Sequence, residues 1–274
     1  MIYNKKLILW LAIIFFSVLK SQENLVANYT LRFKSDSTDT KYTYKNFVLL
    51  HYPQSKESFF LSREKFENDS IKLKQLPNQE TSKNFDFGYM VKKDFNKNYI
   101  FRYEKLLNKL FTINVKAPSN WNIQKETKKI GAFNVQKACL DYKGRSWIAW
   151  FAPDIPIFDG PYVFSGLPGL VIEIMDTKYN YLFTLSSLKS TRFQMFPIMS
   201  LKPIAVTIDE YKKILINHYN EPFREMKYSN VNARWTDENG KEFTPDYREL
   251  TKSEQQAIRK YNNPIELSEA INYK

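Results

Sequence analysis

From residue 25 to about residue 190, hydrophobic and polar residues alternate with the period of a β-strand. In VANYTLRFK (26–34), Tyr29, Leu31 and Phe33 fall on one face and polar residues on the other. Such alternation is typical of an antiparallel strand with one face on the core. The same character returns, between short polar turns, at residues 42–52, 57–61, 85–94, 99–106 and 110–115. Consecutive strands joined by short turns predict hairpins.

A second series of strands begins at Trp121. Its segments are WNIQKETKKI (121–130), FNVQKACLDY (133–142), RSWIAWFAP (145–153), LPGLVIEIMD (167–176) and YLFTLSSL (181–188). Short turns again separate most of them, which favours an antiparallel meander over βαβ units. WIAWF and LVIEIM are apolar on both faces, so we expect them to be central strands covered on both sides.

The periodicity becomes helical after residue 200. TIDEYKKILINHY (207–219) starts with Thr207 and has Glu210 three residues later, the signature of a capping box, and Pro222 ends the pattern. TKSEQQAIRKY (251–261) repeats the arrangement with Thr251 and Glu254. Residues 62–75 fit either a short helix or a polar excursion. The sequence predicts one α+β domain over residues 22–274: mostly antiparallel β, a strongly twisted sheet or half-barrel meander, with C-terminal helices.

The first 21 residues have the pattern of a secretory signal peptide. Lys5 and Lys6 precede an apolar run from Leu7 to Leu19, and the small residue Ser21 follows. The run is shorter than the ~20 apolar residues of a membrane span, which argues against an uncleaved anchor. We expect cleavage after Ser21, no transmembrane anchor in the mature chain, and a periplasmic or secreted protein of the Gram-negative envelope.

The net charge indicates which binding partners are plausible, and the cysteine count excludes an intrachain disulfide. The chain carries a net charge of +12, spread over scattered lysines. A basic surface suits anionic groups of the cell envelope, and export makes nucleic acid a poor partner. Cys139 is the only cysteine, so no intrachain disulfide can form. We expect it to be buried as a small hydrophobic residue rather than to act as a nucleophile.

Glycine and proline concentrate in one short region. Of seven glycines and twelve prolines, four of each lie between residues 144 and 169. Glycine allows positive φ and close backbone approach, whereas proline fixes φ. We therefore predict a rigid corner before the strand at 170–176, with Gly166 or Gly169 at positive φ or tightly approached. The residues that form this structural motif are Gly160, Pro161, Gly166, Leu167, Pro168, Gly169 and Leu170.

Residues 142–176 resemble the signature of the GLPGLI family of exported bacterial proteins. The motif itself is GLPGLV at Gly166–Val171, where valine stands in place of isoleucine. The resemblance extends to WNIQKETKKIGAFNVQKA (121–138) and NNPIEL (262–267). It implies export to the envelope, and it implies no particular activity because the family has none established.

Carboxylates near the motif allow two interpretations. Asp154, Asp159 and Glu173 could perform acid–base chemistry if burial raised the pKa of one of them, as in an envelope hydrolase. Alternatively, Asp154 and Asp159 bond turn amides and Glu173 pairs with Arg145 across the sheet. The latter is favoured. GLPG lacks the Lys and Ser/Thr of a phosphate-binding loop, and Ser165 is not framed as a nucleophile elbow.

Metal and cofactor sites find little support in the sequence. His218 and Glu221 are three residues apart, but Pro222 ends the helix there. With two histidines and one cysteine in the chain, we expect neither a metal nor a cofactor.

The aromatic content favours a binding hypothesis over the hydrolase. A half-barrel could enclose an amphipathic ligand, or the protein could bind another envelope protein. Arg145 is expected at the rim of the cavity, where an anionic group could pair with it. The other candidate ligand-binding residues are Trp147, Trp150, Asp154, Asp159 and Glu173. Three further aromatic residues are candidates to line the cavity: Phe151, Phe164 and Phe183. Trp147 and Trp150 fall on opposite strand faces, so at most one of them lines it. Convergence of the three carboxylates on one cavity would favour the hydrolase, and dispersal would favour the binder.

Overall fold

A computed structural model describes residues 23–74, 88–192, 194–228, 235–236, 239–243 and 245–274. The predicted signal peptide (1–21) and residues 85–87 of the strand expected at 85–94 lie outside these ranges.

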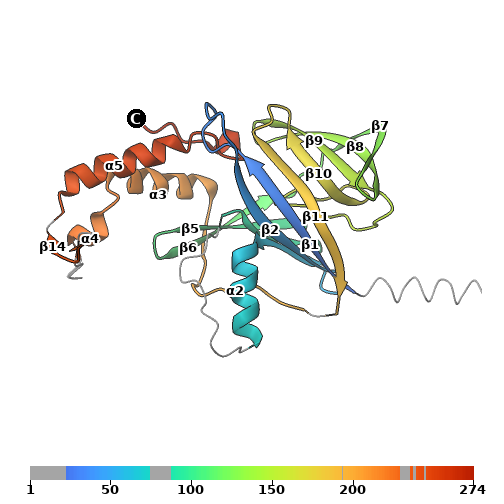
Figure 1. Cartoon of the computed structure of the whole chain (residues 1–274), viewed down its shortest axis with the longest axis horizontal. Coiled ribbons are helices and arrows are strands. Elements are labelled where there is room, and N and C mark those ends of the chain that lie inside the picture. The colour runs from blue at the N-terminus through green and yellow to red at the C-terminus, as the bar shows by residue number, and fades with distance from the viewer. Residues whose placement is uncertain (1–22, 75–87, 193, 229–234, 237–238, 244) are drawn as a thin grey trace, which may run out of the picture.

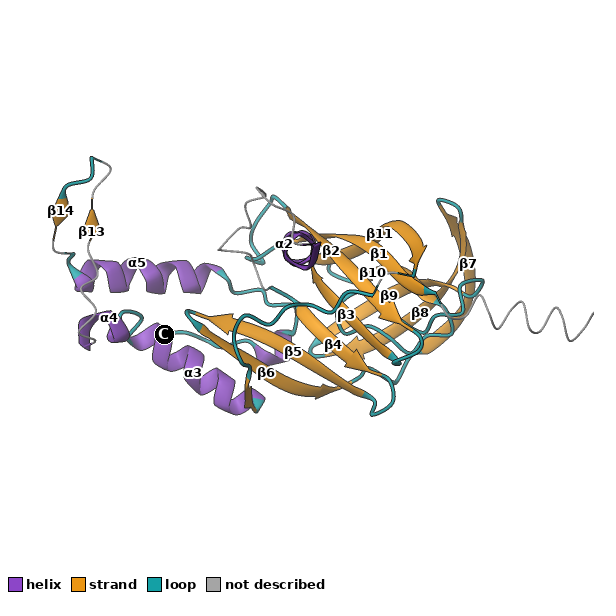
Figure 2. Cartoon of the chain, turned by 90° about the horizontal axis from the view of Figure 1, so that it is seen from below, coloured by secondary structure: helices purple, strands orange, loops and turns teal. Residues whose placement is uncertain are grey.

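Twelve strands of the described chain form one open sheet, and all but one of its ladders are antiparallel (Figures 1 and 2). Its order is β12-β6-β5-β4-β3-β2-β1-β11-β10-β9-β8-β7. This confirms the predicted fold class. The strands are β1 (Asn24–Phe33), β2 (Thr43–Tyr52), β3 (Glu57–Ser62), β4 (Met90–Asp94), β5 (Tyr99–Leu106), β6 (Lys109–Lys116), β7 (Asn122–Ile130), β8 (Phe133–Tyr142), β9 (Arg145–Ala152), β10 (Leu170–Asp176), β11 (Tyr181–Thr191) and β12 (Ile204–Val206).

The sheet consists of two meanders joined through β1. Strands β1 to β6 follow one another in space, as do β7 to β11, and β11 then pairs with β1 along its whole length. The N-terminal strand therefore lies in the middle of the sheet. The exception to the antiparallel pattern is β12, which pairs parallel to β6 at one edge.

The helices lie outside the sheet, one against its strands and three at one end of the molecule. Helix α2 (Arg63–Lys74) packs against β2 and β3, which decides in favour of a helix at 62–75. Helices α3 (Ile208–Asn220), α4 (Arg224–Tyr228) and α5 (Tyr247–Lys260) form an arm at one end of the molecule, with a small hairpin of β13 (Trp235–Thr236) and β14 (Glu242–Phe243) (Figure 1). A 3-10 helix, η1 (Leu267–Glu269), follows where the chain returns to the sheet.

The predicted helix caps are right for α3 and wrong for α5. Thr207 and Glu210 form the capping box, with each side chain accepting the other residue's backbone N–H at 2.8 and 3.2 Å. Helix α5 begins four residues before the predicted cap, because Asp246 accepts the Arg248 N–H at 2.8 Å. Thr251 lies inside the helix, where its hydroxyl donates to the Tyr247 carbonyl at 2.6 Å.

The loop between β9 and β10 (residues 153–169) packs against one face of the sheet. This inner face carries Phe47, Phe60 and Phe183, and the loop residues Val163, Phe164 and Leu167 are fully buried against it. The ring of Phe164 lies 4.6 Å from that of Trp147. The loop is thus a corner, as predicted, and also a plug that supplies core side chains to both meanders.

The plug corrects the prediction of an aromatic-lined cavity within a half-barrel. Trp147, Phe151, Phe164 and Phe183 have exposed fractions of 0–1 %. They form a solid core because the loop that follows β9 folds back and fills the space above the strands.

The glycines of the motif have the predicted backbone geometry. Gly166 has φ +90° and Gly169 has φ +157°. A Cβ on Gly169 would overlap the Ala152 carbonyl oxygen and lie 2.7 Å from its carbon. A Cβ on Gly160 would lie 2.7 Å from the Cβ of Val171. Glycine is therefore required by conformation at Gly166, by contact at Gly160 and by both at Gly169.

Substitution of Gly169 separates these two requirements. We expect Gly169→Val to lower the free energy of unfolding by about 2–3 kcal/mol, through backbone strain plus the overlap with Ala152. Gly131→Val is the matched control, because Gly131 has φ +57° but open space around it; it should cost about 1 kcal/mol. Denaturant unfolding measures both, and equal losses would show that the overlap carries no energy.

Candidate functional site

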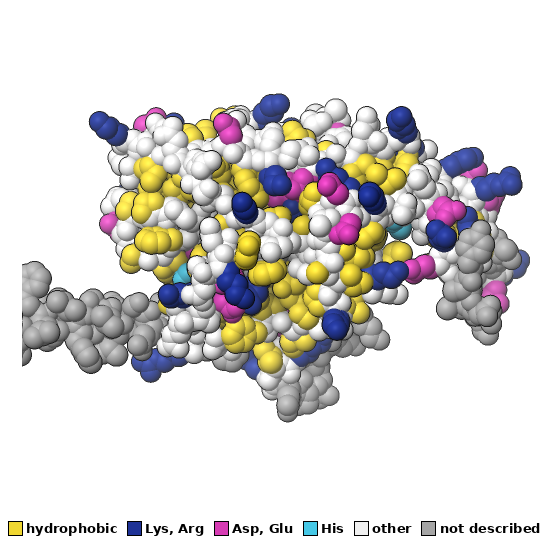
Figure 3. All heavy atoms as spheres, turned by 180° about the vertical axis from the view of Figure 1, so that it is seen from behind, with side chains coloured by type: hydrophobic (Ala, Val, Ile, Leu, Met, Phe, Trp, Pro, Cys, Tyr) yellow, Lys and Arg dark blue, Asp and Glu magenta, His cyan; other side chains and the backbone are white. Residues whose placement is uncertain are grey.

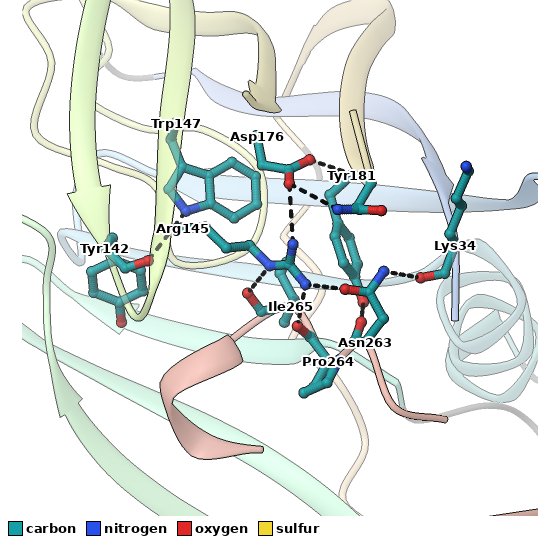
Figure 4. Close-up of polar contacts among 10 residues, drawn as sticks. Lys34, Tyr142, Arg145, Trp147, Asp176, Tyr181, Asn263, Pro264 and Ile265 are labelled. Atoms are coloured by element: carbon teal, nitrogen blue, oxygen red, sulfur yellow. Dashed lines mark hydrogen bonds and ion pairs between the residues drawn. The ribbon is translucent and has the colours of Figure 1, made fainter. Parts of the chain in front are cut away.

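Arg145, the first residue of β9, holds the C-terminal segment against the motif strands (Figure 4). Its Nε donates to the Ile265 carbonyl at 2.9 Å, and its Nη1 donates to Oδ2 of Asp176 at 3.1 Å. Its Nη2 donates to Oδ1 of Asn263 at 2.6 Å and to the Pro264 carbonyl at 2.7 Å. The guanidinium is buried, and four oxygens accept its N–H groups.

The acceptors of Arg145 are themselves held in place. Asp176 accepts the backbone N–H of Tyr181 at 2.8 Å, and the Tyr181 hydroxyl donates to the Asn263 carbonyl at 2.6 Å. The Asn263 side chain donates to the Lys34 carbonyl at 2.8 Å. This network, the Arg145 clamp, connects β9, β10, β11, the residue that follows β1 and the chain after α5 (Figure 4).

The clamp corrects two predictions about Arg145. It does not lie at an exposed rim, and its carboxylate partner is Asp176 rather than Glu173. Strand alternation gives the reason: Asp176 lies opposite Trp147 on the inner face, whereas Glu173 lies opposite Trp150 on the other face. There, Glu173 approaches the Lys128 ammonium at 3.4 Å.

Asp159 forms a second buried polar cluster, between the loop and the first meander. Its Oδ1 accepts the Lys93 ammonium at 2.6 Å and the Gly160 N–H at 2.8 Å, and its Oδ2 lies 2.9 Å from Nδ1 of His51. The Lys93 ammonium also donates to the Gly160 carbonyl at 2.6 Å. Although burial by itself raises the pKa of Asp159, Lys93 and His51 hold this pKa well below its ordinary value.

Sequence reasoning missed both partners of Asp159. A signal was present, because His51 and Lys93 continue the inward alternation of Phe47–Leu49 in β2 and of Val91 in β4. A polar residue at an inward position of a strand requires a buried partner. Nothing in the periodicity identifies that partner as Asp159.

The structure separates the three candidate carboxylates. Asp154 is exposed in the turn after β9, Asp159 is fully buried under the loop, and Glu173 lies on the outer face of β10. Asp159 accepts the amide of Gly160, as the turn interpretation predicts. The three groups face three different environments.

The two tryptophans lie on opposite faces of β9, as predicted. Trp147 is in the core, and its Nε1 donates to the Tyr142 carbonyl at 3.4 Å. Trp150 is half-buried, and the Lys128 ammonium lies 4.1 Å from the centre of its ring. Trp150 therefore belongs to a surface contact between β9, β10 and the edge strand β7.

A pocket of about 280 Å³ lies beside the Arg145 clamp, between β5, the plug loop, α3 and the returning C-terminal segment. Arg102 lines it and is buried: Nη2 donates to Glu104 at 3.0 Å, and Nη1 donates to Glu269 at 2.8 Å and contacts Glu266. We call this the Tyr–Glu pocket, and the residues that define it are Tyr89, Arg102, Glu104, Tyr162, Tyr211, Glu266 and Glu269.

The Tyr–Glu pocket is physically continuous with the clamp. Tyr162, from the motif, donates its hydroxyl to Glu266 at 3.1 Å. The hydroxyl of Tyr89 hydrogen-bonds to that of Tyr181, which in turn donates to Asn263. The motif, the clamp and the pocket therefore form one polar region at the end of the sheet nearest the helical arm.

The described ranges contain neither a candidate metal cluster nor a helix that could cross a membrane. There, no group of three or more His, Cys, Asp or Glu side chains could hold a metal ion. Cys139 of β8 is a free thiol and only half-buried, less enclosed than the sequence predicts. No helix in the same part of the chain is long and apolar enough to cross a bilayer.

Comparisons with known proteins find a family model that matches a short part of the chain and solved structures with a similar fold. Residues 142–173 match Porph_ging, a family described as a protein of unknown function. No curated protein matches the chain significantly. Crystal forms of PNGF-II in space groups C2 and P21 are similar over 70 % of this chain, with TM-scores of 0.50 and 15 % identity.

The structural likeness concerns the fold alone. The match spans only 32–33 % of the PNGF-II chain, about a third of its length. An uncharacterised conserved protein from Thermus thermophilus aligns with 70 % of this chain and 97 % of its own, at a TM-score of 0.35 and 9 % identity. The family match falls on β9, the plug loop and β10, the region that also supplies Arg145, Asp159 and Tyr162.

Proposed function

We propose that this chain is an exported GLPGLI-type protein of the bacterial cell envelope that acts by binding a ligand or partner rather than by catalysis. The signal-peptide pattern at 1–21 and the motif resemblance over 142–176 support export and family. The match of residues 142–173 to a family of unknown function is consistent with membership of an uncharacterised family.

The separation of Asp154, Asp159 and Glu173 is the observation that favours binding over hydrolysis. A pair that performs acid–base chemistry must reach one substrate atom within hydrogen-bond distance. Asp154 is exposed, Asp159 is enclosed by Lys93 and His51, and Glu173 lies behind the sheet. Asp159 and Arg145 instead stabilise the motif, so their chemistry is structural.

The surface is where binding would occur. The aromatic interior is packed, and the buried guanidinium of Arg145 donates to four protein oxygens, which contradicts an anionic head group at Arg145. On the face shown in Figure 3, hydrophobic side chains are interspersed with Lys, Arg, Asp and Glu. A mixed surface of this kind suits an amphipathic ligand or an envelope protein.

Fractionation and native mass spectrometry test this function. With export, the mature chain should begin at Gln22, fractionate with periplasmic or secreted protein, and carry an additional mass that denaturation releases. A preparation from cytoplasm of cells with the 1–21 segment deleted is the control, and should lack that mass. Retention of Met1 in a membrane-bound protein would contradict export, and hydrolysis of an envelope substrate would contradict the binding role.

A further inference from the structure

We propose that the Tyr–Glu pocket binds the ammonium group of a small organic cation. The proposal rests on the binding function above and names the chemistry of one ligand. The pocket volume of about 280 Å³ suits a head group or small molecule rather than a polymer.

Carboxylate groups outnumber guanidinium groups in the pocket by three to one. Glu104, Glu266 and Glu269 all contact the single buried guanidinium of Arg102. Lys143 approaches Glu269 at 2.7 Å, so the five ion-paired side chains together carry one negative charge in excess, which the charge of Lys212 at the pocket wall offsets. Burial disfavours the charged guanidinium, yet the neighbouring carboxylates of Glu104 and Glu269 hold the pKa of Arg102 above its usual value.

Glu104 is the carboxylate that a ligand can reach. Its side chain is 29 % exposed, compared with 4 % for Glu266 and 12 % for Glu269. Only its Oε1 accepts from Arg102. The other oxygen is therefore in a position to pair with a cation in the pocket.

Tyrosine rings provide walls of the kind that organic cations prefer. Tyr89 and Tyr162 meet at an interplanar angle of 80°, with ring centroids 5.7 Å apart, and form an aromatic corner. Tyr211 lines the pocket from α3. Rings around a carboxylate attract an ammonium through the negative faces of their π-systems.

The aromatic corner is held in an uncommon backbone conformation. Tyr89 has φ +61° and Tyr162 has φ +50°, in the left-handed region that bulky residues rarely adopt. The Tyr89 hydroxyl is fixed by Tyr181 and the Tyr162 hydroxyl by Glu266. Both rings are therefore positioned before a ligand arrives, which lowers the entropic cost of binding.

The basic net charge of the protein does not oppose binding at this site. Charges in solvent are screened over about 8 Å at physiological ionic strength, so the carboxylates nearest the ligand dominate. Three cations oppose the ligand: Arg102 and Lys143, which are ion-paired with the glutamates, and Lys212, which lines the pocket from α3. Removing the charge of Lys212 should strengthen the binding of a cation, because like charges repel each other.

Titration with choline tests the proposal. Ligand-observed NMR should show saturable binding of choline to the folded protein, at least tenfold tighter than its neutral isostere in which carbon replaces nitrogen. Glu104→Gln should weaken choline binding by about tenfold and Lys212→Gln should tighten it by about threefold, with little change for the isostere. Glu173→Gln is the matched control, because it removes a carboxylate on the outer face of the sheet.

Two outcomes would overturn the proposal. The first is choline binding no tighter than the isostere, which needs no variant and is independent of folding effects. The second is equal choline affinity in wild type, Glu104→Gln and Lys212→Gln. Neither outcome changes the fractionation or the carried-mass result, so failure of this site is distinguishable from failure of the binding function.

Discussion

Asp159→Asn should lower the free energy of unfolding by about 3–5 kcal/mol at neutral pH. The substitution keeps the size of the side chain but removes its charge. It leaves the Lys93 ammonium, 1 % exposed, without a counter-ion in the core. Asp159 also connects the plug loop to β2 and β4, so its loss should loosen the loop as a unit. Denaturant unfolding with urea measures the effect.

The pH dependence of this effect has a defined sign. Because the folded-state pKa of Asp159 lies below the unfolded value of about 3.9, its contribution is complete above that pH and is lost as the pH falls through the folded pKa. The stability difference between wild type and Asp159→Asn should therefore shrink below about pH 4. Asp154→Asn, an exposed aspartate of the same loop, is the control and should lie within about 0.5 kcal/mol of wild type. Equal losses for the two variants would contradict the assigned role of the Asp159 cluster.

Arg145→Met should destabilise the protein by a similar amount, about 3–5 kcal/mol. Methionine fills much of the volume but donates no hydrogen bond. Asp176, 1 % exposed, then loses its cation, and the carbonyl groups of Pro264 and Ile265 lose their donor. Hydrogen exchange should show residues 263–266 opening at lower free energy than in wild type, because the clamp is what holds them.

A lysine at position 145 tests whether the fork of the guanidinium matters. Arg145→Lys retains the charge, but one ammonium cannot reach both Asp176 and the carbonyl of Ile265 as the three guanidinium nitrogens do. We expect it to recover less than half of the loss. Arg248→Met, on the exposed side of α5, is the control and should be close to neutral. Full recovery by lysine would mean that charge alone holds the segment.

Local patterns in the sequence determined most of the architecture. Period-two alternation located the strands, and a capping box located the start of α3. The cluster of glycine and proline marked a corner whose tight approach at Gly169 the structure confirms. These features depend on residues within a few positions of one another, so one segment contains all the information they need. The cap of α5 was missed because two local signals competed, and Asp246 was the one the backbone used.

Only the tertiary structure decided where the polar residues of the motif meet their partners. Arg145 bonds to residues some 120 positions later, and Asp159 pairs with Lys93 and His51, 66 and 108 positions earlier. Strand alternation shows which side chains point inward, but it does not show which strand lies beside which. That choice depends on β11 pairing with β1, which brings the two meanders into one sheet and leaves the plug loop between them. The Tyr–Glu pocket arises in the same way, because β5, the loop, α3 and the C-terminal segment are adjacent only after that long-range pairing is made.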